Sequence, residues 1–149
     1  LVPFYEAQKA STPERKFADF LEANKQYFEW WYKNGENAKE HFAIPYEDYT
    51  GKQSLFYVDF VILAKNKTTY LFDTKTMGSD PANAHLKHNA LIDFIAERNN
   101  KGLKTIGGII IEKEVNGISV WKYCSNKTKD TKDLTGWDFF NPATININE

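Results

Sequence analysis

The sequence predicts an α/β fold in which a mixed central β-sheet is flanked by helices. Between residues 55 and 123, apolar runs rich in aromatic and β-branched residues alternate with polar turns, as expected of strands. Two further segments, Thr12–Gln26 and Pro81–Arg98, carry apolar residues at spacings of three and four, as expected of amphipathic helices. The chain has 149 residues, enough for one core, so we expect a single domain over residues 1–149.

The first predicted helix begins at Ser11-Thr12-Pro13-Glu14 and is followed by an aromatic strand. Ser11-x-x-Glu14 is a capping-box pattern, in which Glu14 would cap backbone amides. The next segment, Tyr27 to Asn34, combines large rings with a lysine and predicts a strand that ends in a turn at Asn34-Gly35. We expect its rings to pack in the core, because a small domain needs large side chains to fill it.

The run Leu55–Leu63 predicts a strand covered on both faces, and it contains one acidic residue, Asp59. An unpaired carboxylate inside such a strand would cost several kcal/mol. Some partner must therefore compensate the charge of Asp59.

The next strand, Thr69–Lys75, carries the second acid. The period of two puts Asp73 and Lys75 on the same face. A three-residue connection centred on Asn66 or Lys67 would place Asp59 opposite Asp73 or Lys75, and cross-strand neighbours lie ~5 Å apart.

Two aspartates at that distance repel each other unless a cation lies between them. Hard oxygen ligands with room for water favour Mg²⁺, with Mn²⁺ as a substitute, over Zn²⁺. Lys75 would orient or help deprotonate an attacking water and offset charge on a phosphate. The alternative is structural, since Asp-x-Lys is short and also fits a salt-bridged strand end with Asp59 at a bulge.

The remaining elements complete the sheet and its second helix. Ser79-Asp80-Pro81 predicts the start of that helix, whose buried side would comprise Leu91, Ile92, Phe94 and Ile95. Lys104–Ile111 and Gly117–Tyr123 predict strands, and the glycine pair in the first of them implies a bulge or a close backbone approach. The tail from Asp133 is expected to be irregular.

Composition limits the compartment and the mode of binding. The formal net charge is −1, which argues against a protein that wraps DNA by bulk electrostatics. The single cysteine, Cys124, excludes an internal disulfide framework, and the sequence has neither a signal peptide nor a long apolar span. We expect a soluble, cytoplasmic protein with no membrane partner.

Asp59 followed by Asp73-x-Lys75 resembles the signature of the PD-(D/E)XK nuclease superfamily. The stretches His41–Tyr46 and Phe56–Phe60 resemble the C-terminal endonuclease domain of type III restriction enzymes, and the resemblance runs from about residue 12 to residue 99. It implies a restriction-endonuclease-like core and Mg²⁺-dependent cleavage of double-stranded DNA.

The resemblance also implies residue roles. Asp59, Asp73 and the carbonyl of Thr74 would bind the metal, and Lys75 would serve the attacking water. Glu14 would hold a second metal or its water. The capping-box interpretation of Glu14 remains the alternative. Lys87 would contact the scissile phosphate or support the active centre, although its position favours a solvated surface lysine.

Further implications concern a larger protein. The chain starts at Leu1 without an initiator methionine and has no phosphate-binding loop for ATP, so we expect a fragment. The resemblance places an ATP-dependent helicase-like translocase N-terminal in the same polypeptide. A separate modification methyltransferase subunit would read the recognition sequence.

Two other functions fit parts of the sequence. Val58 stands where the nuclease family usually has proline, which favours a catalytically inactive nuclease-fold module that binds nucleic acid or a partner protein. A glycoside hydrolase could use Asp59 and Asp73 as acid and base, but it leaves Lys75 without a role. Such a hydrolase would work in chelator, whereas a nuclease of this kind needs a divalent ion.

Overall fold

The computed structural model describes residues 12–34, 42–79, 83–127 and 130–145. Its helices are α2 (Thr12–Ala23), α3 (Ala84–Asn100) and two short 3₁₀ helices, η1 (Lys25–Tyr27) and η3 (Pro142–Thr144). Its strands are β1 (Phe28–Lys33), β2 (Ala43–Glu47), β3 (Gln53–Tyr57), β4 (Phe60–Ala64), β5 (Thr69–Lys75), β6 (Thr105–Val115), β7 (Ile118–Cys124) and β8 (Asp138–Phe139).

Six of these strands form one sheet in the order β1-β4-β5-β6-β7-β8, whereas β2 and β3 form a separate hairpin. Strands β5 and β6 are parallel and are connected through α3, while the other neighbouring pairs are antiparallel. The predicted fold class, a mixed central sheet flanked by helices, is thus confirmed at this level.

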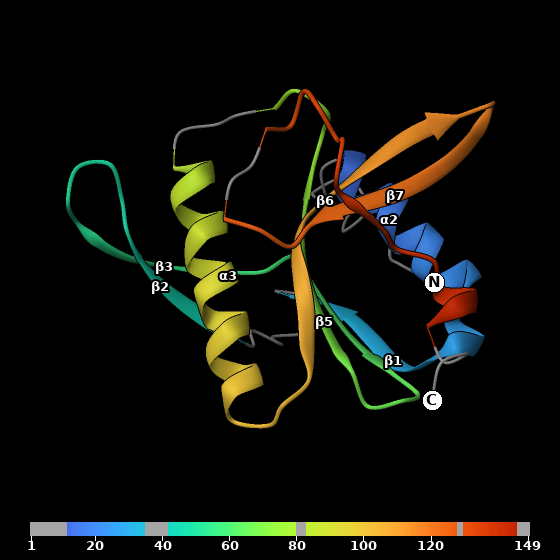
Figure 1. Cartoon of the computed structure of the whole chain (residues 1–149), viewed down its shortest axis with the longest axis horizontal. Helices are drawn as coiled ribbons and strands as arrows, with labels where there is room; N and C mark the ends of the chain where they lie inside the picture. The colour runs from blue at the N-terminus through green and yellow to red at the C-terminus, as the bar shows by residue number, and fades with distance from the viewer. Residues whose placement is uncertain (1–11, 35–41, 80–82, 128–129, 146–149) are drawn as a thin grey trace, which may run out of the picture.

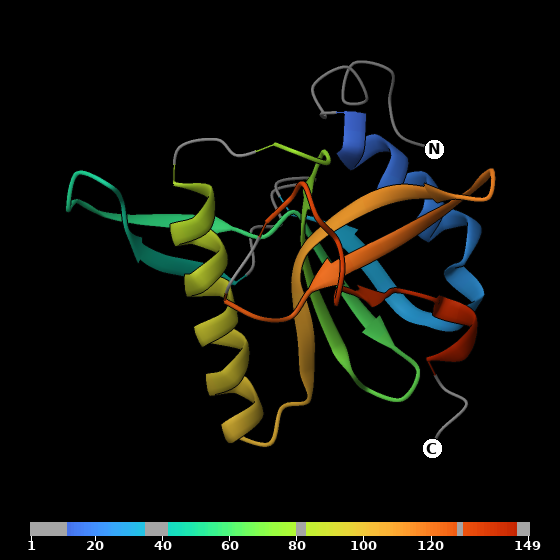
Figure 2. The same cartoon turned by 45° about the horizontal axis from the view of Figure 1, so that its top comes forward.

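The two helices cover opposite faces of the sheet. Figures 1 and 2 both show α3 and the β2–β3 hairpin on one side of the strands and α2 on the other. Alternation along β5 divides the core accordingly, because Tyr70 and Phe72 pack with Phe17 of α2 whereas Leu71 packs with Leu91 of α3. Each face of the sheet therefore has its own hydrophobic core.

The core beneath α2 is built mostly from aromatic rings. Phe17 is fully buried and its ring lies 5.0 Å from that of Phe60 and 4.8 Å from that of Trp121, between centroids. Phe140 joins the same cluster, with its ring 4.9 Å from that of Phe72. The expected irregular tail is therefore only partly correct, since it contributes β8, η3 and a core residue.

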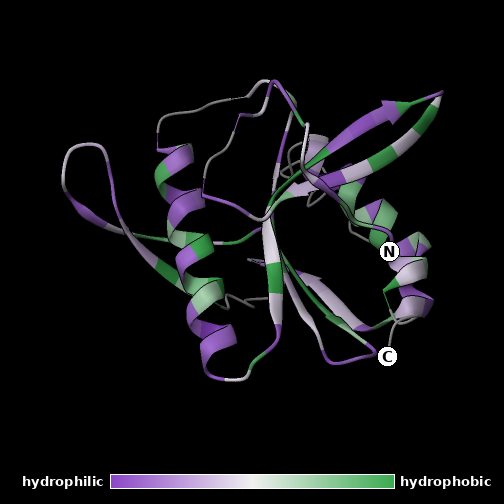
Figure 3. Cartoon of the chain, in the orientation of Figure 1, coloured by the Kyte–Doolittle hydropathy of each residue, from purple (hydrophilic) through white to green (hydrophobic). Residues whose placement is uncertain are grey.

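Hydropathy follows this arrangement. Figure 3 shows hydrophobic residues where the strands cross the middle of the molecule and hydrophilic residues in the last turn of α3. Among the described residues, no helix combines the length and apolar character needed to cross a bilayer.

The glycine pair in β6 allows the close backbone approach that the sequence predicted. A Cβ on Gly107 would lie 1.9 Å from the carbonyl oxygen of Leu71, and a Cβ on Gly108 would lie 1.9 Å from that of Cys124. Real Cβ atoms do not come this near to backbone oxygens. The absence of side chains here lets β6 pair with both of its neighbours.

Both predicted helices needed corrected boundaries. The first ends at Ala23 rather than Gln26, because the Asn24 side chain caps the Phe20 carbonyl at 2.8 Å and the chain tightens into η1. The second begins at Ala84, after Asn83 with a left-handed φ of 67° that no helix interior accommodates. The expected start at residues 79–81 falls partly outside the described residues, since 80–82 are not described.

Candidate active site

Asp59 lies between two strands rather than inside one. The predicted strand Leu55–Leu63 is wrong as a single element, since β3 ends at Tyr57 and β4 begins at Phe60. The break arises because the two halves pair with different partners, β3 with β2 and β4 with β1 and β5. Asp59 is therefore the residue at which the chain passes from the hairpin into the central sheet.

The carboxylate of Asp59 is held by one residue of β5. Its Oδ2 accepts hydrogen bonds from the backbone N–H and from the hydroxyl of Thr74, each at 2.9 Å. Thr74 lies beyond the last residue pair of the β4–β5 ladder, Phe60 with Phe72. The side chain of Asp59 thus accepts an N–H group at the point where the ladder ends.

The backbone on the other side of Asp59 is also fixed. Asn34, which follows β1, donates its backbone N–H to the carbonyl of Asp59 at 2.9 Å. The Asn34 side chain donates to the carbonyl of Val58 at 2.6 Å. These bonds hold the strand break in one conformation.

The hairpin between β4 and β5 has the connection that the sequence predicted. Ala64 donates its N–H to the carbonyl of Thr68, which leaves a three-residue loop centred on Asn66, and Lys67 takes the left-handed φ of 70° typical of such loops. The register pairs Phe60 with Phe72, so one step further places Asp59 beside Asp73. The loop geometry therefore carries the two acids to the same end of the hairpin.

Asp73 and Lys75 point the same way, as their spacing predicted. The ammonium Nζ of Lys75 lies 2.9 Å from Oδ2 of Asp73 and 3.4 Å from the carbonyl oxygen of Thr74. Both side chains are largely covered, with 22% of the Lys75 side chain and 14% of the Asp73 side chain exposed. The lysine thus neutralises Asp73 in this state of the protein.

Glu14 reaches the same region from α2. It shares one stripe of the helix with the buried Phe17 and Leu21, at spacings of three and seven. Figures 1 and 2 both show the first turn of α2 beside the C-terminal end of β5. The Glu14 carboxylate forms an ion pair with Nζ of Lys33 at 3.0 Å. The capping-box interpretation depends on Ser11, which lies outside the described residues.

The three carboxylates act on one another electrostatically. Burial of its carboxyl group raises the pKa of Asp59 well above the usual value, and the charges of Asp73 and Glu14 raise it further. The Thr74 N–H and the ammonium of Lys75 act in the opposite direction but do not cancel the effect. An additional positive charge beside Asp59 would therefore favour its ionised form.

The pKa of Lys75 is also raised, which for an amine favours the charged form. Burial of its ammonium lowers the pKa of Lys75, but Asp73, with smaller effects from Asp59 and Glu14, raises it above the ordinary value overall. Lys75 is therefore a cation in this arrangement. It can donate hydrogen bonds and supply charge, and it cannot take up a proton.

The donor chemistry of these residues fits Mg²⁺. Asp59 and Asp73 supply carboxylate oxygens and Thr74 a carbonyl, all hard ligands, and a cation between the carboxylates would offset the repulsion that helps to raise the pKa of Asp59. The described residues contain no group of three or more His, Cys, Asp or Glu side chains arranged to hold a metal. Two protein carboxylates with water in the remaining positions is a usual Mg²⁺ arrangement.

Lys87 makes a different contact from the one expected of a phosphate ligand. Its Nζ lies 5.7 Å from the centroid of the Tyr46 ring, against the β2–β3 hairpin. This cation–π contact explains the position of the side chain without a substrate.

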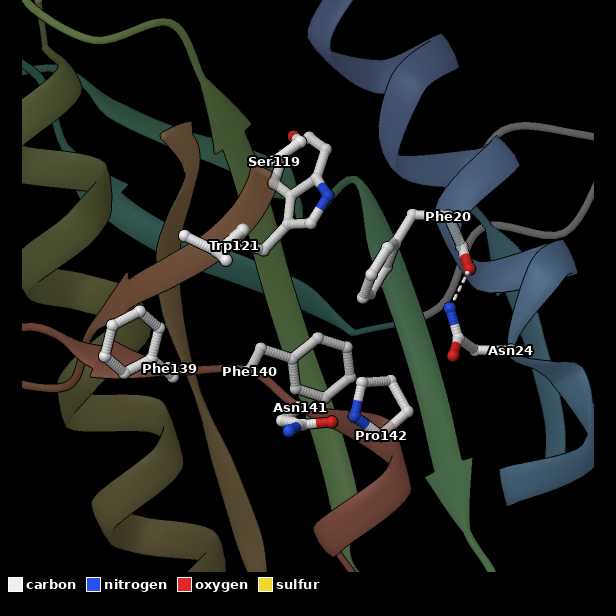
Figure 4. A pocket seen from close by; sticks show the side chains of 9 residues that line it. Phe20, Asn24, Ser119, Trp121, Phe139, Phe140, Asn141 and Pro142 are labelled. Atoms are coloured by element: carbon white, nitrogen blue, oxygen red, sulfur yellow. Dashed lines mark hydrogen bonds between the residues drawn. The ribbon is translucent and has the colours of Figure 1, made fainter. Parts of the chain in front are cut away.

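A separate pocket of about 250 Å³ lies at the other end of α2, between β7 and the C-terminal segment. Figure 4 shows Phe20, Trp121 and Phe140 around it, with Asn24 bonded to the Phe20 carbonyl. Glu14 is in the first turn of α2, whereas Asn24 follows its last residue. The pocket therefore belongs to the aromatic core and not to the acidic cluster formed by Glu14, Asp59 and Asp73.

Sequence reasoning missed two residues of the cluster, Lys33 and Asn34. The pattern of the aromatic strand predicts core packing, and nothing in it connects Lys33 with Glu14 or Asn34 with Asp59. The available signal was the position of a lysine and an asparagine at the end of a strand, where polar groups often meet a site.

The YagJ family model matches residues 6–131 of the chain. Neither a curated protein nor a solved structure matches the sequence.

Proposed function

The chain belongs to the YagJ family, and we propose that this member is a metal-dependent DNA endonuclease that hydrolyses phosphodiester bonds of double-stranded DNA. The observation that carries the proposal is the convergence of Asp59, Asp73 and Lys75 at the end of the β4–β5 hairpin. A buried acid of raised pKa next to a second acid and an ammonium is typical of a catalytic site.

The position in the sheet supports the same proposal. Asp73 and Lys75 lie at the C-terminal end of β5, which pairs in parallel with β6 through the crossover helix α3. In sheets with parallel strands, ligands bind outside the carboxyl ends of the strands.

Each residue has a role that its contacts allow. Asp59 and Asp73 would hold Mg²⁺, with the carbonyl of Thr74 as a further donor, and Thr74 keeps the Asp59 carboxylate oriented through two hydrogen bonds. Bound there, Mg²⁺ would supply an activated water and neutralise charge on the phosphate. Lys75 orients the water and stabilises the developing negative charge by donating hydrogen bonds, because its raised pKa keeps it protonated.

Glu14 would serve as the third acid of the site. Its charge already acts on Asp59 and on Lys75, which supports a position facing the cluster. Its ion pair with Lys33 holds the carboxylate in place in the absence of substrate. Lys87, on the Tyr46 ring, has weaker support as a phosphate contact.

The finer proposal is that this is the endonuclease domain of a type III restriction-modification enzyme. It rests on the sequence pattern around Asp59 and Asp73 alone. Its partners would be an ATP-dependent helicase-like domain in the same polypeptide and a modification methyltransferase subunit.

One observation favours a second function, an inactive module that binds nucleic acid or a protein. Lys75 already pairs with Asp73 at 2.9 Å, so a permanent ion pair could replace the metal. In that case divalent ions would neither stabilise the fold nor support cleavage.

The decisive experiment combines cleavage with metal-linked stability. Linear and supercoiled DNA are incubated with the chain and Mg²⁺, Mn²⁺ or EDTA, and the melting temperature is recorded against metal concentration. We expect metal-dependent cleavage that is abolished by EDTA and by either Asp73→Ala or Lys75→Ala, together with a metal-induced rise in melting temperature that Asp73→Ala removes. Cleavage that survives both substitutions, or that persists in EDTA, would overturn the proposal.

A further inference from the structure

A second ammonium group, that of Lys33, lies in the acidic cluster, and the established contacts give it no catalytic role. Its Nζ is 3.0 Å from Oε2 of Glu14, and the two side chains are only 19% and 21% exposed. The surface pair of Lys67 and Glu29 has a similar length, 3.1 Å, but its side chains are 72% and 42% exposed. The Lys33–Glu14 pair is thus partly removed from water, where charges act on each other more strongly.

The backbone of Lys33 is fixed next to Asp59. In the β1–β4 ladder Lys33 pairs with Phe60, the residue that follows Asp59. The next residue, Asn34, donates its N–H to the Asp59 carbonyl at 2.9 Å. Lys33 therefore approaches the cluster from β1, while Lys75 approaches it from β5.

The net charge of the acidic cluster depends on Lys33. Glu14, Asp59 and Asp73 are three carboxylates, and Lys33 and Lys75 are two ammonium groups, so the ionised cluster carries one net negative charge. A divalent ion would change this to one net positive charge, which matches the single negative charge of a phosphodiester. Without Lys33, the metal-loaded cluster would be neutral and would attract a phosphodiester less.

We propose that Lys33 is a phosphate-binding residue that holds the DNA backbone at this site. An ammonium has three N–H donors, so Lys33 can keep Glu14 on one and donate another to a phosphate oxygen. Glu14 positions the ammonium in advance and reduces the side-chain freedom lost when DNA binds. This inference rests on the proposed nuclease function and adds to it a substrate contact.

The test is DNA binding rather than turnover. The full chain is titrated with a short duplex in Ca²⁺, which takes the same kind of oxygen ligands as Mg²⁺, at a series of salt concentrations. Lys33→Gln should weaken binding by about 10-fold or more, as expected for the loss of a charged hydrogen bond. The slope of log affinity against log salt should fall by about 0.9, the value for one phosphate contact on B-DNA.

Two variants control for other effects. Lys67→Gln removes a lysine from the exposed pair with Glu29 and should leave affinity and slope unchanged. Lys33→Arg keeps the charge and should restore most of the salt slope. Thermal unfolding of each variant shows that binding is compared between folded proteins.

The outcomes separate this inference from the proposed function. If Lys33→Gln lowers the melting temperature but binds DNA with the wild-type salt slope, Lys33 only ties α2 to β1 and the inference is wrong. If the wild-type chain cleaves DNA in a metal-dependent way that Asp73→Ala abolishes while Lys33→Gln binds normally, the nuclease proposal stands without it. If the wild-type chain neither binds nor cleaves the duplex, both fail.

Discussion

Thr74 donates both its backbone N–H and its hydroxyl to the same oxygen, Oδ2 of Asp59, each at 2.9 Å. Thr74 is buried, with 4% of its surface exposed, so water does not compete strongly for these bonds. These two hydrogen bonds connect the break between β3 and β4 to the C-terminal end of β5. Both bonds use Oδ2, so the Oδ1 oxygen of Asp59 makes no bond to Thr74 in this pair.

The first prediction concerns this hydroxyl. Thr74→Val keeps the shape of the side chain and the backbone bond but removes the hydroxyl bond, so the Asp59 carboxylate loses one of its two Thr74 contacts. We expect metal affinity to fall by about 10-fold, the lower end of the range for groups that orient a metal ligand. The measurement is the rise in melting temperature with Mg²⁺ or Mn²⁺.

Thr74→Ser is the matched control, because it keeps the hydroxyl and loses one methyl group. It should bind metal as the wild type does, with a small loss of stability from the missing methyl. Equal metal affinity in the valine and serine variants would show that the hydroxyl does not orient Asp59.

The second prediction concerns the pH dependence that follows from the raised pKa of Asp59. Below about pH 4 the carboxyl is protonated in both the folded and the unfolded chain, since its ordinary pKa is 3.8. As the pH rises above that value the unfolded chain releases the proton first. Asp59 should therefore destabilise the metal-free protein increasingly until its folded pKa is passed, and its contribution should then level off.

Asp59→Asn should remove this loss, because asparagine cannot ionise and its carbonyl can still accept the Thr74 bonds. Without metal, the variant should be more stable than the wild type at neutral pH and similar to it below about pH 4. Divalent ions should stabilise the wild type at neutral pH but not the variant. Urea unfolding across this pH range provides the measurement, and parallel curves for the two proteins would contradict the prediction.

The third prediction tests the close approach of β6 to β5. Gly107→Ala would put a Cβ 1.9 Å from the Leu71 carbonyl oxygen, so the two central strands must separate. We expect a loss of more than about 3 kcal/mol in the free energy of unfolding, as for other severe overpacking. Chemical denaturation at neutral pH measures it.

Gly102→Ala provides the comparison, since a Cβ there meets nothing within 4 Å although φ is +82°. Its cost should be about 1 kcal/mol, from the left-handed backbone alone. A loss for Gly107→Ala no greater than for Gly102→Ala would mean that the strands have room to move apart.

The parts of the site that follow from local rules were predictable. The period of two in β5 put Asp73 and Lys75 on one face, and the ion pair at 2.9 Å agrees. The three-residue loop centred on Asn66 follows from the polar turn residues between two apolar runs. These features depend on neighbours in sequence, so the sequence is sufficient for them.

The parts that depend on tertiary pairing were not predictable. The run Leu55–Leu63 is apolar apart from Asp59, and its pattern does not indicate that its first half pairs with β2 and its second half with β1 and β5. The Lys33–Glu14 ion pair likewise requires α2 to pack against the end of β1. Both misses come from contacts between segments far apart in the chain.

The last prediction concerns the C-terminal segment, where two adjacent phenylalanines have opposite environments. Phe140 is 4% exposed and its ring packs against those of Phe72 and Tyr70, whereas Phe139 is 59% exposed. Phe140→Ala should cost about 3–5 kcal/mol, because it leaves a cavity among aromatic rings. Phe139→Ala should cost under about 1 kcal/mol, the usual range for an exposed position, with some loss from the Lys122 ammonium 4.7 Å from its ring. Urea unfolding of the two variants gives the comparison, and equal costs would mean that the segment after β7 does not close the core beneath α2.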